Sequence, residues 1–420
     1  MGGESPKGYR HAGDYQLDKL FLALPDGTGQ DIRGIVTEIN IYQDINKHYM
    51  ECDFVVNDAK GIIENFDGVG IVQMTFSTTD DDELELSFAT HELSNKVRVT
   101  DRSEAYTIHG VSEEAYVTTI KKISRAFGKG SGNTIDKMIQ GLYKEFFTES
   151  KKPISVDKTK AKARFIIPNY TVDDTIKFMK EEAVSDSIAS KFFFYETFEG
   201  YNFKDLNTLI QNQNPLLSFK YNPMNYAESD TEKQFDDALN ILSFAQSTQK
   251  NYFVRVLKGQ FKSKTINIDL LRKKKTEVKF DFDKQYTRFN TFAKKKFNSI
   301  SVPHDAVINL MTSRKGHDQD SVLSAEGHVP KRINEEKAYR DSYMENFMQV
   351  VNLKVPGNPI LNVGKVIEIE IPKMNFNNEE DERADKYISG KYLITASRHN
   401  FNGEVYTTSL QCVRDAGEEV

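Results

Sequence analysis

The sequence predicts an α+β fold that is mainly β, with two similar antiparallel β-barrel domains and α/β segments inserted between strand blocks. Two strand-rich blocks predict the barrels, because residues 350–413 echo the pattern of residues 35–99. Between them, at Ser112, the apolar residues change from a period of two to a helical period, which indicates a different kind of domain. We therefore expect a β-rich protein with helical insertions.

The block at residues 350–414 predicts the closing half of a small barrel made of short strands. Isoleucine alternates with glutamate from Ile367 to Ile371, so one face of this strand is apolar and the other polar. Pro372 ends the strand, and Asn402-Gly403 predicts a tight hairpin with two positive-φ positions. Polar side chains at every second position are typical of the solvent face of a half-buried sheet. This block therefore favours binding or assembly over catalysis.

The composition is that of a soluble globular protein of about two to four domains. The hydrophobic fraction of 38% supports a core, but no window approaches a membrane span, and the start lacks a secretory signal. The net charge of -6 argues against a surface that binds nucleic acid throughout. We interpret the basic runs at residues 272–275 and 294–296 as solvated loop charge. Cys52 and Cys412 lie in strand-like runs and are expected to be small buried apolar residues.

After a polar leader, the first hundred residues predict strands. Met50, Cys52, Phe54 and Val56 share one face of such a strand. The strand-like runs are IRGIVTEINIY, HYMECDFVV, VGIVQMTF, LELSF and KVRV. An acidic run at residues 80–83 interrupts them, and we interpret it as a solvated loop. A calcium site is the alternative, but the run lacks the spaced ligands and the turn glycine of a calcium loop.

Two amphipathic helices are predicted next. The first is capped by Ser112, carries its apolar stripe to Phe127 and ends at Gly128. The second covers residues 135–147. The GKGSGN link between them resembles a phosphate loop, but Lys129 stands between two glycines instead of following four free positions. A connector between helices is therefore the favoured interpretation.

The segment from residue 165 to residue 203 predicts a strand, FIIP, a helix at 172–184, and then an aromatic run. The run KFFFYETFEGYNF could form a stacking platform for nucleic-acid bases. Neighbouring aromatic residues in a strand point to opposite faces, however, and no basic residues interleave with them. A core strand that is buried on both faces is therefore favoured.

The segment from residue 216 to residue 348 mixes strands and helices. LLSFKY, NYFVRVL, KTINIDLL and TEVKFDF predict strands, and Thr231 with Gln234 predicts a capped helix. A last helix is expected at 334–348. The unpatterned stretch 297–330 raises a metal hypothesis, although none of its histidine pairs has helical or zinc-finger spacing, so a polar loop is favoured. The residues concerned are His304, Asp305, His317, Asp318, Asp320 and His328.

Four runs together resemble the central baseplate hub proteins of contractile-tailed bacteriophages, which are related to the hub half of VgrG-type spike proteins. The run at residues 35–66 is similar to the first barrel of that family, and the run at 167–210 to its αβ segment. The runs at 358–375 and 389–415 are similar to the end of its second barrel. The resemblance is weakest over residues 252–330, where we expect an insertion.

The resemblance implies two tail-tube-like barrels in each chain and three chains closed into a ring. Six barrels would then face a hexameric tail tube, while the ring keeps the threefold symmetry of a trimeric spike. The expected domains are a first β-barrel at 1–103, an α+β domain at 104–205, a split second β-barrel at 206–235 and 345–415, an inserted α+β domain at 236–344, and a tail at 416–420.

The function implied is a non-enzymatic symmetry adaptor that anchors the spike, caps the tube and forms part of the channel for DNA ejection. We expect no catalytic, cofactor-binding or metal-ligating residues, no cofactor, no specific nucleic-acid binding and no membrane segment. The expected partners are two further copies in a homotrimer, a trimeric spike or tail lysozyme protein, tail tube or tube-initiator proteins, surrounding baseplate proteins, and the tape-measure protein in the channel. The expected location is the virion tail baseplate, after assembly in the host cytoplasm.

The chain ends soon after the second barrel, so we expect a separate spike protein, which the tail from Asp415 onward would contact. Three alternatives stay open. The hub of a bacterial contractile injection system would use the same fold. A cell-wall hydrolase would need an acid and a nucleophile in one cleft. A carbohydrate-binding adhesin would keep its aromatic residues at loop tips, whereas most here fall within predicted strands or helices.

Overall fold

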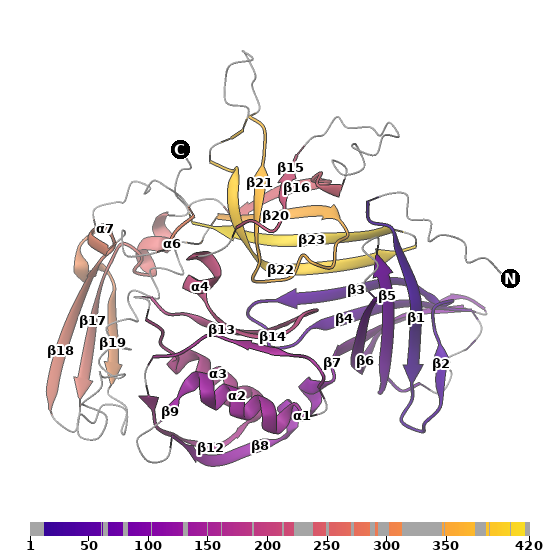
Figure 1. The fold of residues 1–420 in the computed structure, drawn as a ribbon, viewed down its shortest axis with the longest axis horizontal. Helices are drawn as coiled ribbons and strands as arrows, with labels where there is room; N and C mark the ends of the chain where they lie inside the picture. The colour runs from indigo at the N-terminus through magenta and orange to yellow at the C-terminus, as the bar shows by residue number, and fades with distance from the viewer. Residues whose placement is uncertain are drawn as a thin grey trace.

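The strand blocks from the two ends of the sequence join edge to edge in one large sheet in the computed structural model (Figure 1). The joint is the antiparallel pair of β3 (Val36–Asp44) and β22 (Gly390–Asn402), in which Ile41 lies opposite His399. The structure describes residues 12–59, 61, 66–78, 83–101, 103–128, 133–148, 150–160, 162–186, 189–211, 214–221, 238–248, 252–269, 273–285, 290–292, 302–312, 347, 349–373, 384–385, 387–403 and 405–415.

The large sheet has 13 strands, of which eleven follow one another in the order β16-β20-β23-β22-β3-β4-β7-β6-β5-β1-β2 and β15 and β21 branch off β22. The bounds of those not yet given are β16 (Ser243–Thr248), β20 (Gln349–Pro356), β23 (Val405–Arg414), β4 (Glu51–Asp58), β7 (Ser103–Ser112), β6 (Glu83–Thr100), β5 (Gly70–Thr78), β1 (Tyr15–Ala23), β2 (Gly29–Asp31), β15 (Ser218–Lys220) and β21 (Val366–Glu370).

This architecture confirms the mainly β fold with large antiparallel sheets. Within the described residues neither block closes into a barrel of its own, because β3 and β22 pair with each other. The two expected strand blocks are present, and each has its own hydrophobic core, but they belong to one sheet and do not form two closed barrels in the described residues. β16 and all of β7 after Ser103 lie outside the two expected barrel ranges, yet both strands pair within this sheet.

The alternating pattern placed the core residues of the blocks correctly. Met50, Cys52, Phe54 and Val56 are all buried, as are the isoleucines of the run at residues 367–371. Burial of each such side chain contributes about 1.5–3 kcal/mol. The two predicted runs LELSF and KVRV form one strand, β6, and the polar leader was wrong beyond residue 14, since β1 pairs with β5 along its whole length.

The predicted helix from Ser112 to Phe127 is wrong. A short helix, α1 (Glu114–Ile120), is followed by the strand β8 (Lys122–Phe127), which pairs with β12 (Phe165–Thr171). Ser112 ends β7 and does not cap α1. Ile123 is buried in the core of this segment and Phe127 packs against Phe165, so pairing with β12 outweighs the local helical period.

The two other helices of the middle segment are confirmed as α2 (Ile135–Phe146) and α3 (Val172–Glu182). They lie between the β8–β12 pair and the hairpin of β13 (Phe192–Thr197) and β14 (Gly200–Asp205) (Figure 1). Thr171 caps α3 by accepting a hydrogen bond from the backbone N–H of Asp174. Short elements complete this region, namely β9 (Asn133–Thr134), β10 (Ile154–Val156), β11 (Lys162–Ala163) and α4 (Leu206–Gln211).

The aromatic run forms β13 and β14, and every residue of β13 is buried. Phe194 packs with Tyr201 in the core of the α/β segment, whereas Phe193 and Tyr195 belong to the core of the second strand block. The interpretation as a core strand buried on both faces is confirmed. β13 thereby connects two cores.

A separate, smaller sheet has the order β18-β17-β19, with bounds β18 (Lys274–Asp281), β17 (Lys262–Asp269) and β19 (Ile308–Thr312). Three short helices accompany it, α6 (Tyr252–Leu257), α7 (Phe282–Gln285) and the 3-10 helix η2 (His304–Ala306). The strand predicted from NYFVRVL is wrong, because this run forms α6. Arg255 of this helix is buried, and its guanidinium lies 5.5 Å from the centre of the Phe261 ring. The local sequence pattern does not predict this contact.

Several predictions lie outside the described residues. They are the capped helix with Thr231 and Gln234, the acidic run at 80–82, residues 129–132 of the link, the basic residues 272 and 294–296, and the last helix apart from Phe347. The hairpin between β22 and β23 is confirmed, with positive φ at Gly403 and not at Asn402. No helix in the described part of the chain is long and apolar enough to cross a membrane.

Candidate functional site

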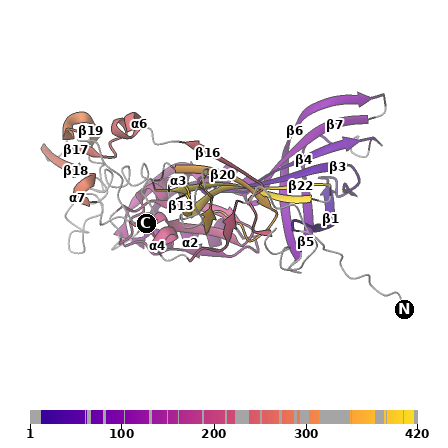
Figure 2. The same cartoon turned by 90° about the horizontal axis from the view of Figure 1, so that it is seen from above.

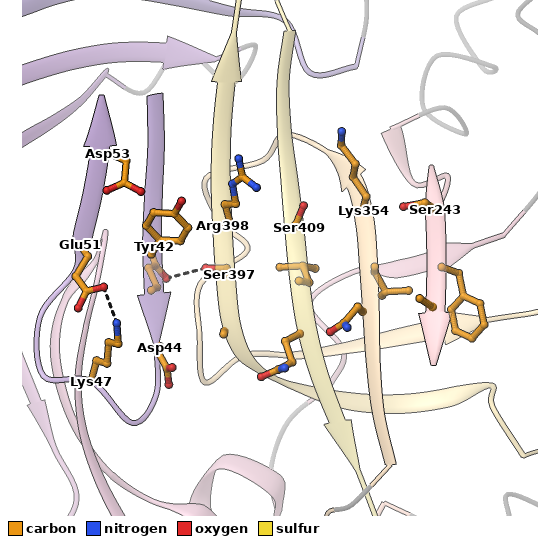
Figure 3. A pocket seen from close by; sticks show the side chains of 18 of the residues that line it. Tyr42, Asp44, Lys47, Glu51, Asp53, Ser243, Lys354, Ser397, Arg398 and Ser409 are labelled. Carbon is orange, nitrogen blue, oxygen red and sulfur yellow. Dashed lines mark hydrogen bonds and ion pairs between the residues drawn. The ribbon is translucent and has the colours of Figure 1, made fainter. Parts of the chain in front are cut away.

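The polar faces of six neighbouring strands form one open groove across the joint of the two blocks (Figure 3). We call this surface the junction face. It has a volume of about 850 Å³ and is formed by β4, β3, β22, β23, β20 and β16, with Lys47 of the β3–β4 turn and His109 of β7 at its edge. One row of side chains crosses all six strands in register, namely Glu51, Tyr42, Arg398, Ser409, Lys354 and Ser243.

The alternation of each strand explains why these side chains share one face. Tyr42 lies opposite Arg398, whereas the adjacent pair, Ile41 and His399, is fully buried on the other side of the sheet. The same alternation continues in β4, where Cys52 points inward and Asp53 outward. The chain therefore places apolar residues under the joint and leaves a polar surface above it.

Hydrogen bonds on the junction face tie β3 to β22. Arg398 Nε donates to Asn40 Oδ1 at 2.7 Å, and Arg398 Nη2 donates to Glu38 Oε1 at 2.9 Å. Asn400 Nδ2 donates to the same two oxygens at 2.8 and 2.7 Å. The Arg398 side chain is 45% exposed, so its ion pair adds about 0–1 kcal/mol. These contacts fix which residues of β3 lie opposite which residues of β22, and they contribute little to the stability of the fold.

A buried amide pair lies on the other side of the joint. Gln43 Nε2 donates to Asn362 Oδ1 at 2.8 Å, and the backbone N–H of Val363 donates to Gln43 Oε1 at 3.2 Å. The backbone N–H of Phe198 also donates to Asn362 Oδ1, at 3.3 Å. Because an unpaired buried amide costs about 1–3 kcal/mol, these bonds hold β3, the loop before β21 and the β13–β14 turn together.

The junction face carries charges of both signs. Asp44, Glu51 and Asp53 supply carboxylates, and Lys47, Lys354 and Arg398 supply cations. Lys47 and Glu51 form an ion pair at 2.5 Å. Burial and the neighbouring Asp53 carboxylate raise the pKa of Tyr42 to about 12, so its hydroxyl keeps its proton at neutral pH. The surface can therefore make many polar contacts without being strongly cationic.

A ladder of three polar residues continues this face onto β7 and β6. Ser94 Oγ lies 2.6 Å from His109 Nε2, and His109 Nδ1 lies 2.6 Å from Asp53 Oδ1. This is the connectivity of a Ser-His-Asp hydrolase triad. In such a triad the acid is buried, whereas here the His109 and Asp53 side chains are each 28% exposed on an open sheet. A polar ladder on the sheet surface accounts for the geometry.

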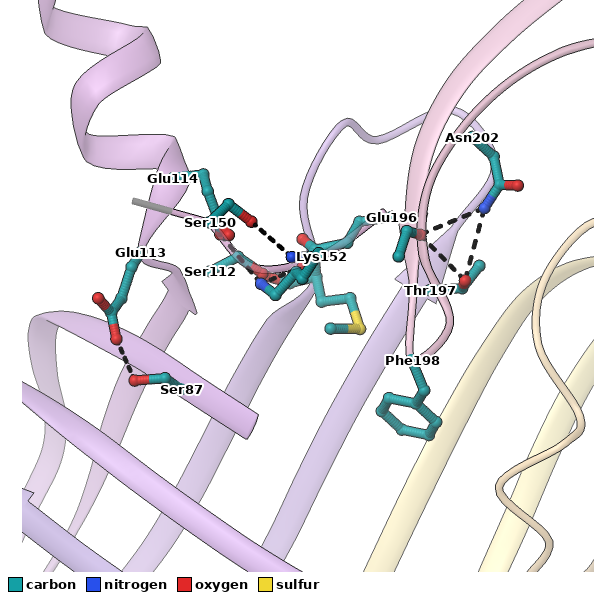
Figure 4. Close-up of polar contacts among 12 residues, drawn as sticks. Ser87, Ser112, Glu113, Glu114, Ser150, Lys152, Glu196, Thr197, Phe198 and Asn202 are labelled. Carbon is teal, nitrogen blue, oxygen red and sulfur yellow. Dashed lines mark hydrogen bonds and ion pairs between the residues drawn. The ribbon is translucent and has the colours of Figure 1, made fainter. Parts of the chain in front are cut away.

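A buried ion cluster connects the α/β segment to the large sheet (Figure 4). Lys152 Nζ donates to Glu196 Oε1 at 2.6 Å and to Glu114 Oε2 at 3.0 Å. The backbone N–H of Met50, just before β4, donates to Glu196 Oε2 at 3.0 Å. The cluster therefore links β13, α1 and the edge of the first strand block.

The pKa values in this cluster follow from burial and charge. Burial raises the pKa of Glu196, and the Lys152 ammonium only partly offsets it. Burial alone would lower the pKa of Lys152, but Glu196 and Glu114 raise it. Burial works against ionised Glu114 as well, yet Lys152 lowers its pKa below the usual value. Lys152 thus holds two carboxylates in place.

The sequence predicted no catalytic, cofactor-binding or metal-ligating residue, and it did not single out the junction face. Among the residues of the metal hypothesis, His304 and Asp305 lie in η2, where Asp305 pairs with Lys264 at 3.6 Å, and the others lie outside the described residues. In the described ranges no group of three or more histidine, cysteine or acidic residues could hold a metal ion. The sequence predicted a polar solvent face for the block at residues 350–414, but not the continuation of that face across the joint onto β3 and β4.

Two smaller expectations concern single residues. Cys52 and Cys412 are buried and unpaired, as predicted. Asp415 is buried as well, and its carboxylate accepts a hydrogen bond from the backbone N–H of Phe292 at 2.8 Å. It is therefore wrong to count Asp415 in an accessible tail, and the rest of that tail, residues 416–420, lies outside the described residues.

No protein-family model and no curated protein matches the sequence. Solved structures with the same fold do exist. One is the tail protein from Neisseria meningitidis MC58, with a TM-score of 0.54, 10% sequence identity, and coverage of 96% of this chain and 97% of that chain. Another is the 43 kDa tail protein of prophage MuSo2 from Shewanella oneidensis, with a TM-score of 0.55, 9% identity, and coverage of 94% and 98%.

At these identities the similarity shows the fold. The chain thus has the fold of phage tail proteins along nearly its whole length. The resemblance to baseplate hub proteins, drawn from four runs of the sequence, is confirmed at that level.

Proposed function

We propose that the chain is the structural baseplate hub of a contractile phage tail. Three copies form a ring that joins the hexameric tail tube to the trimeric spike, and the ring forms part of the channel for DNA ejection. The observation that carries this proposal is the junction face, a hollowed surface of mixed charged, polar and apolar side chains that spans both strand blocks in one continuous sheet. The tail-protein fold supports it.

A ring of three copies would present two strand blocks from each chain. Closed cyclic symmetry satisfies every subunit interface. Because each chain has two similar blocks, a ring of three chains would present six similar units to the tail tube. We also propose the domain ranges expected above, with β7 and β16 added to the blocks they pair with. The ring then connects a sixfold partner, the tail tube, to a threefold partner, the spike, and this role needs no catalytic activity.

The junction face suits the wall of a channel. It mixes carboxylates with cations, and the whole chain has a net charge of -6. A passing nucleic acid binds tightly where many cations contact its phosphates, so a wall of mixed charge lets it slide. The partners in this function are the spike or tail lysozyme protein, tube or tube-initiator proteins, surrounding baseplate proteins and the tape-measure protein. The location is the virion tail baseplate.

The native mass in solution tests this function directly. Three chains of 48.1 kDa that form the ring are expected at about 144 kDa by light scattering, and at a mass larger by that of the bound spike when the spike partner is present. A chain that stays monomeric with the candidate spike would overturn the hub. The hub of a bacterial contractile injection system would give the same mass, and the gene neighbourhood separates the two. Burial of the aromatic run in β13 disfavours a sugar-binding adhesin.

A serine hydrolase is the second candidate function, because Ser94, His109 and Asp53 have the connectivity of a triad. A fluorophosphonate probe reacts with an activated serine, and Ser94→Ala removes that nucleophile. We expect equal, background labelling of both proteins and no clearing of cell-wall substrate in a zymogram. Labelling or clearing that disappears in Ser94→Ala would establish an enzyme in place of a purely structural role.

A further inference from the structure

The small sheet β18-β17-β19 covers only one of its two faces. On the inner face Ser263, Thr265 and Phe280 are buried, and Phe280 belongs to the core of the second strand block. The alternate residues of each strand point to the other face, and there Ile308 and Leu310 are 52% and 66% exposed. Figure 2 shows this sheet at the end of the molecule opposite β1.

Strand register fixes which side chains share the outer face. Three rows cross β18, β17 and β19 in that order, and they consist of Lys279, Lys264 and Ile308, then Glu277, Ile266 and Leu310, then Lys275 and Ile268. We call these eight side chains the insert face. Its β18 column is entirely charged, whereas the apolar side chains lie on β17 and β19.

The apolar part of the insert face forms a continuous strip. Ile266 and Ile268 are half-buried in the central strand, and Ile308 and Leu310 extend the strip to β19. A sheet that is apolar on both faces is normally an inner layer with a further layer packed on each side. The described residues supply that layer on the inner face only.

The helix α6 adds exposed apolar side chains at one end of this sheet. Phe253 and Leu257 lie one turn apart and are 83% and 73% exposed. Gly259, which follows the helix, lies against Val307, the residue immediately before β19. The exposed turn of α6 is therefore close to the end of the sheet at which β19 begins.

The charged column of the insert face is cationic. Glu277 pairs with Lys275 at 2.6 Å and with Lys264 at 3.3 Å. Lys279 is exposed and has no ion pair in the described part of the chain. Three lysines against one glutamate leave this border of the face positive, although the whole chain has a net charge of -6. A partner that complements the border carries carboxylates.

We propose that the insert face is the docking site of an amphipathic α-helix from another protein, with acidic residues beside the apolar stripe of that helix. The stripe would pack on β17 and β19, and the carboxylates would reach Lys279 and Lys275 on β18. β17 has eight residues, so it is about 26 Å long at about 3.3 Å per residue, the length of a helix of about 18 residues. This site goes beyond the proposed hub function and does not require the trimeric ring.

Two other occupants fit the insert face less well. A second copy of the same face would bring two cationic borders together, which is unfavourable. A single-stranded nucleic acid would find lysines, but its bases stack on aromatic side chains, and the eight residues of the insert face include none. An acidic amphipathic helix complements both the aliphatic strip and the lysines.

A synthetic helix tests the site on the full-length chain. The probe is a fluorescent peptide of about 18 residues with leucine along one face and glutamate beside it, and fluorescence anisotropy measures its affinity. One control peptide carries lysine in place of glutamate, and another has the same residues in an order that breaks the leucine stripe. The glutamate peptide is expected to bind about tenfold more tightly, or better, than either control.

Substitutions on the insert face locate the binding. Leu310→Gln removes an exposed apolar side chain, so the affinity for the glutamate peptide is expected to fall about tenfold. Lys279→Glu reverses an exposed charge and is expected to weaken binding of the glutamate peptide and strengthen binding of the lysine peptide. Ile166→Gln on β12 and Lys122→Glu on β8 make the same changes at exposed sites outside this sheet and should alter neither affinity. Circular dichroism checks that each variant is folded.

Three results would overturn the docking site. The first is a glutamate peptide that does not bind at about 1 mM or that binds the parent chain and both insert-face variants equally. The second is a native mass that falls in Leu310→Gln, which would show that a second copy occupies the face. The third is a single-stranded DNA oligonucleotide that binds more tightly than the glutamate peptide and is released by Lys279→Glu.

Discussion

Replacement of Lys152 by methionine is expected to lower the free energy of unfolding by about 3 kcal/mol at neutral pH. The substitution keeps most of the apolar stem but leaves the carboxylates of Glu196 and Glu114 without their shared cation. Glu196 is fully buried and cannot recover this loss from water. Urea unfolding of the variant and the parent protein at pH 7 measures the difference.

The same loss should shrink at lower pH. Burial already raises the pKa of Glu196 in the folded protein, and removal of Lys152 raises it further. A carboxyl group whose folded pKa is raised destabilises the fold fully above the folded pKa; the penalty shrinks as pH falls through the folded pKa and is gone below the unfolded pKa. In the parent protein the opposite holds for Glu114, whose lowered pKa contributes stability that is lost as pH falls. Both effects narrow the gap between variant and parent toward acid pH.

Lys160→Met is the matched control, because Lys160 and Asp186 form an ion pair on the surface with side chains 54% and 80% exposed. Its effect is expected to stay within about 0.5 kcal/mol, as is usual for exposed pairs. If Lys152→Met loses the same stability at pH 7 and pH 5, the charge of the Lys152 ammonium does not account for the loss.

Gly364→Ala is expected to destabilise the fold by about 2–4 kcal/mol, the sum of a strained backbone and an overlap in the core. Gly364 has a φ of 83°, where a side chain is unfavourable, and a Cβ at this position would overlap the hydroxyl of Tyr195. Tyr195 lies in β13 and belongs to the core of the second strand block. Thermal or urea unfolding reports the loss.

A double variant separates the two causes. Tyr195→Phe removes the overlapping hydroxyl, so Gly364→Ala with Tyr195→Phe should recover part of the loss while the backbone strain remains. Gly141→Ala is the control, because Gly141 lies in α2 with open space around it and alanine there is expected to stabilise by about 0.5–1 kcal/mol. A double variant no more stable than Gly364→Ala alone would show that backbone strain accounts for the whole effect.

The sequence by itself determined which residues of many elements are buried. The alternation from Met50 to Val56, the two helices α2 and α3, and the burial of the aromatic run in β13 were all predicted correctly. Each of these is a local pattern of apolar residues with a period of a strand or a helix. Such a pattern indicates which side chains are buried without knowledge of the elements that cover them. The same patterns supported the resemblance to hub proteins.

Only the tertiary structure decided which elements meet. The local period predicted a helix for β8, but this segment is a strand in which Phe127 pairs with Phe165 of β12. The local pattern predicted a strand for α6, but this segment is a helix that buries Arg255 against Phe261. The joint of β3 with β22 joins residues more than 350 positions apart. Strands pair through backbone N–H and C=O groups that nearly all residues share. A sequence pattern can therefore predict a strand, but it does not show which other strand lies beside it. The junction face, which depends on that pairing, could therefore be found only in the folded chain.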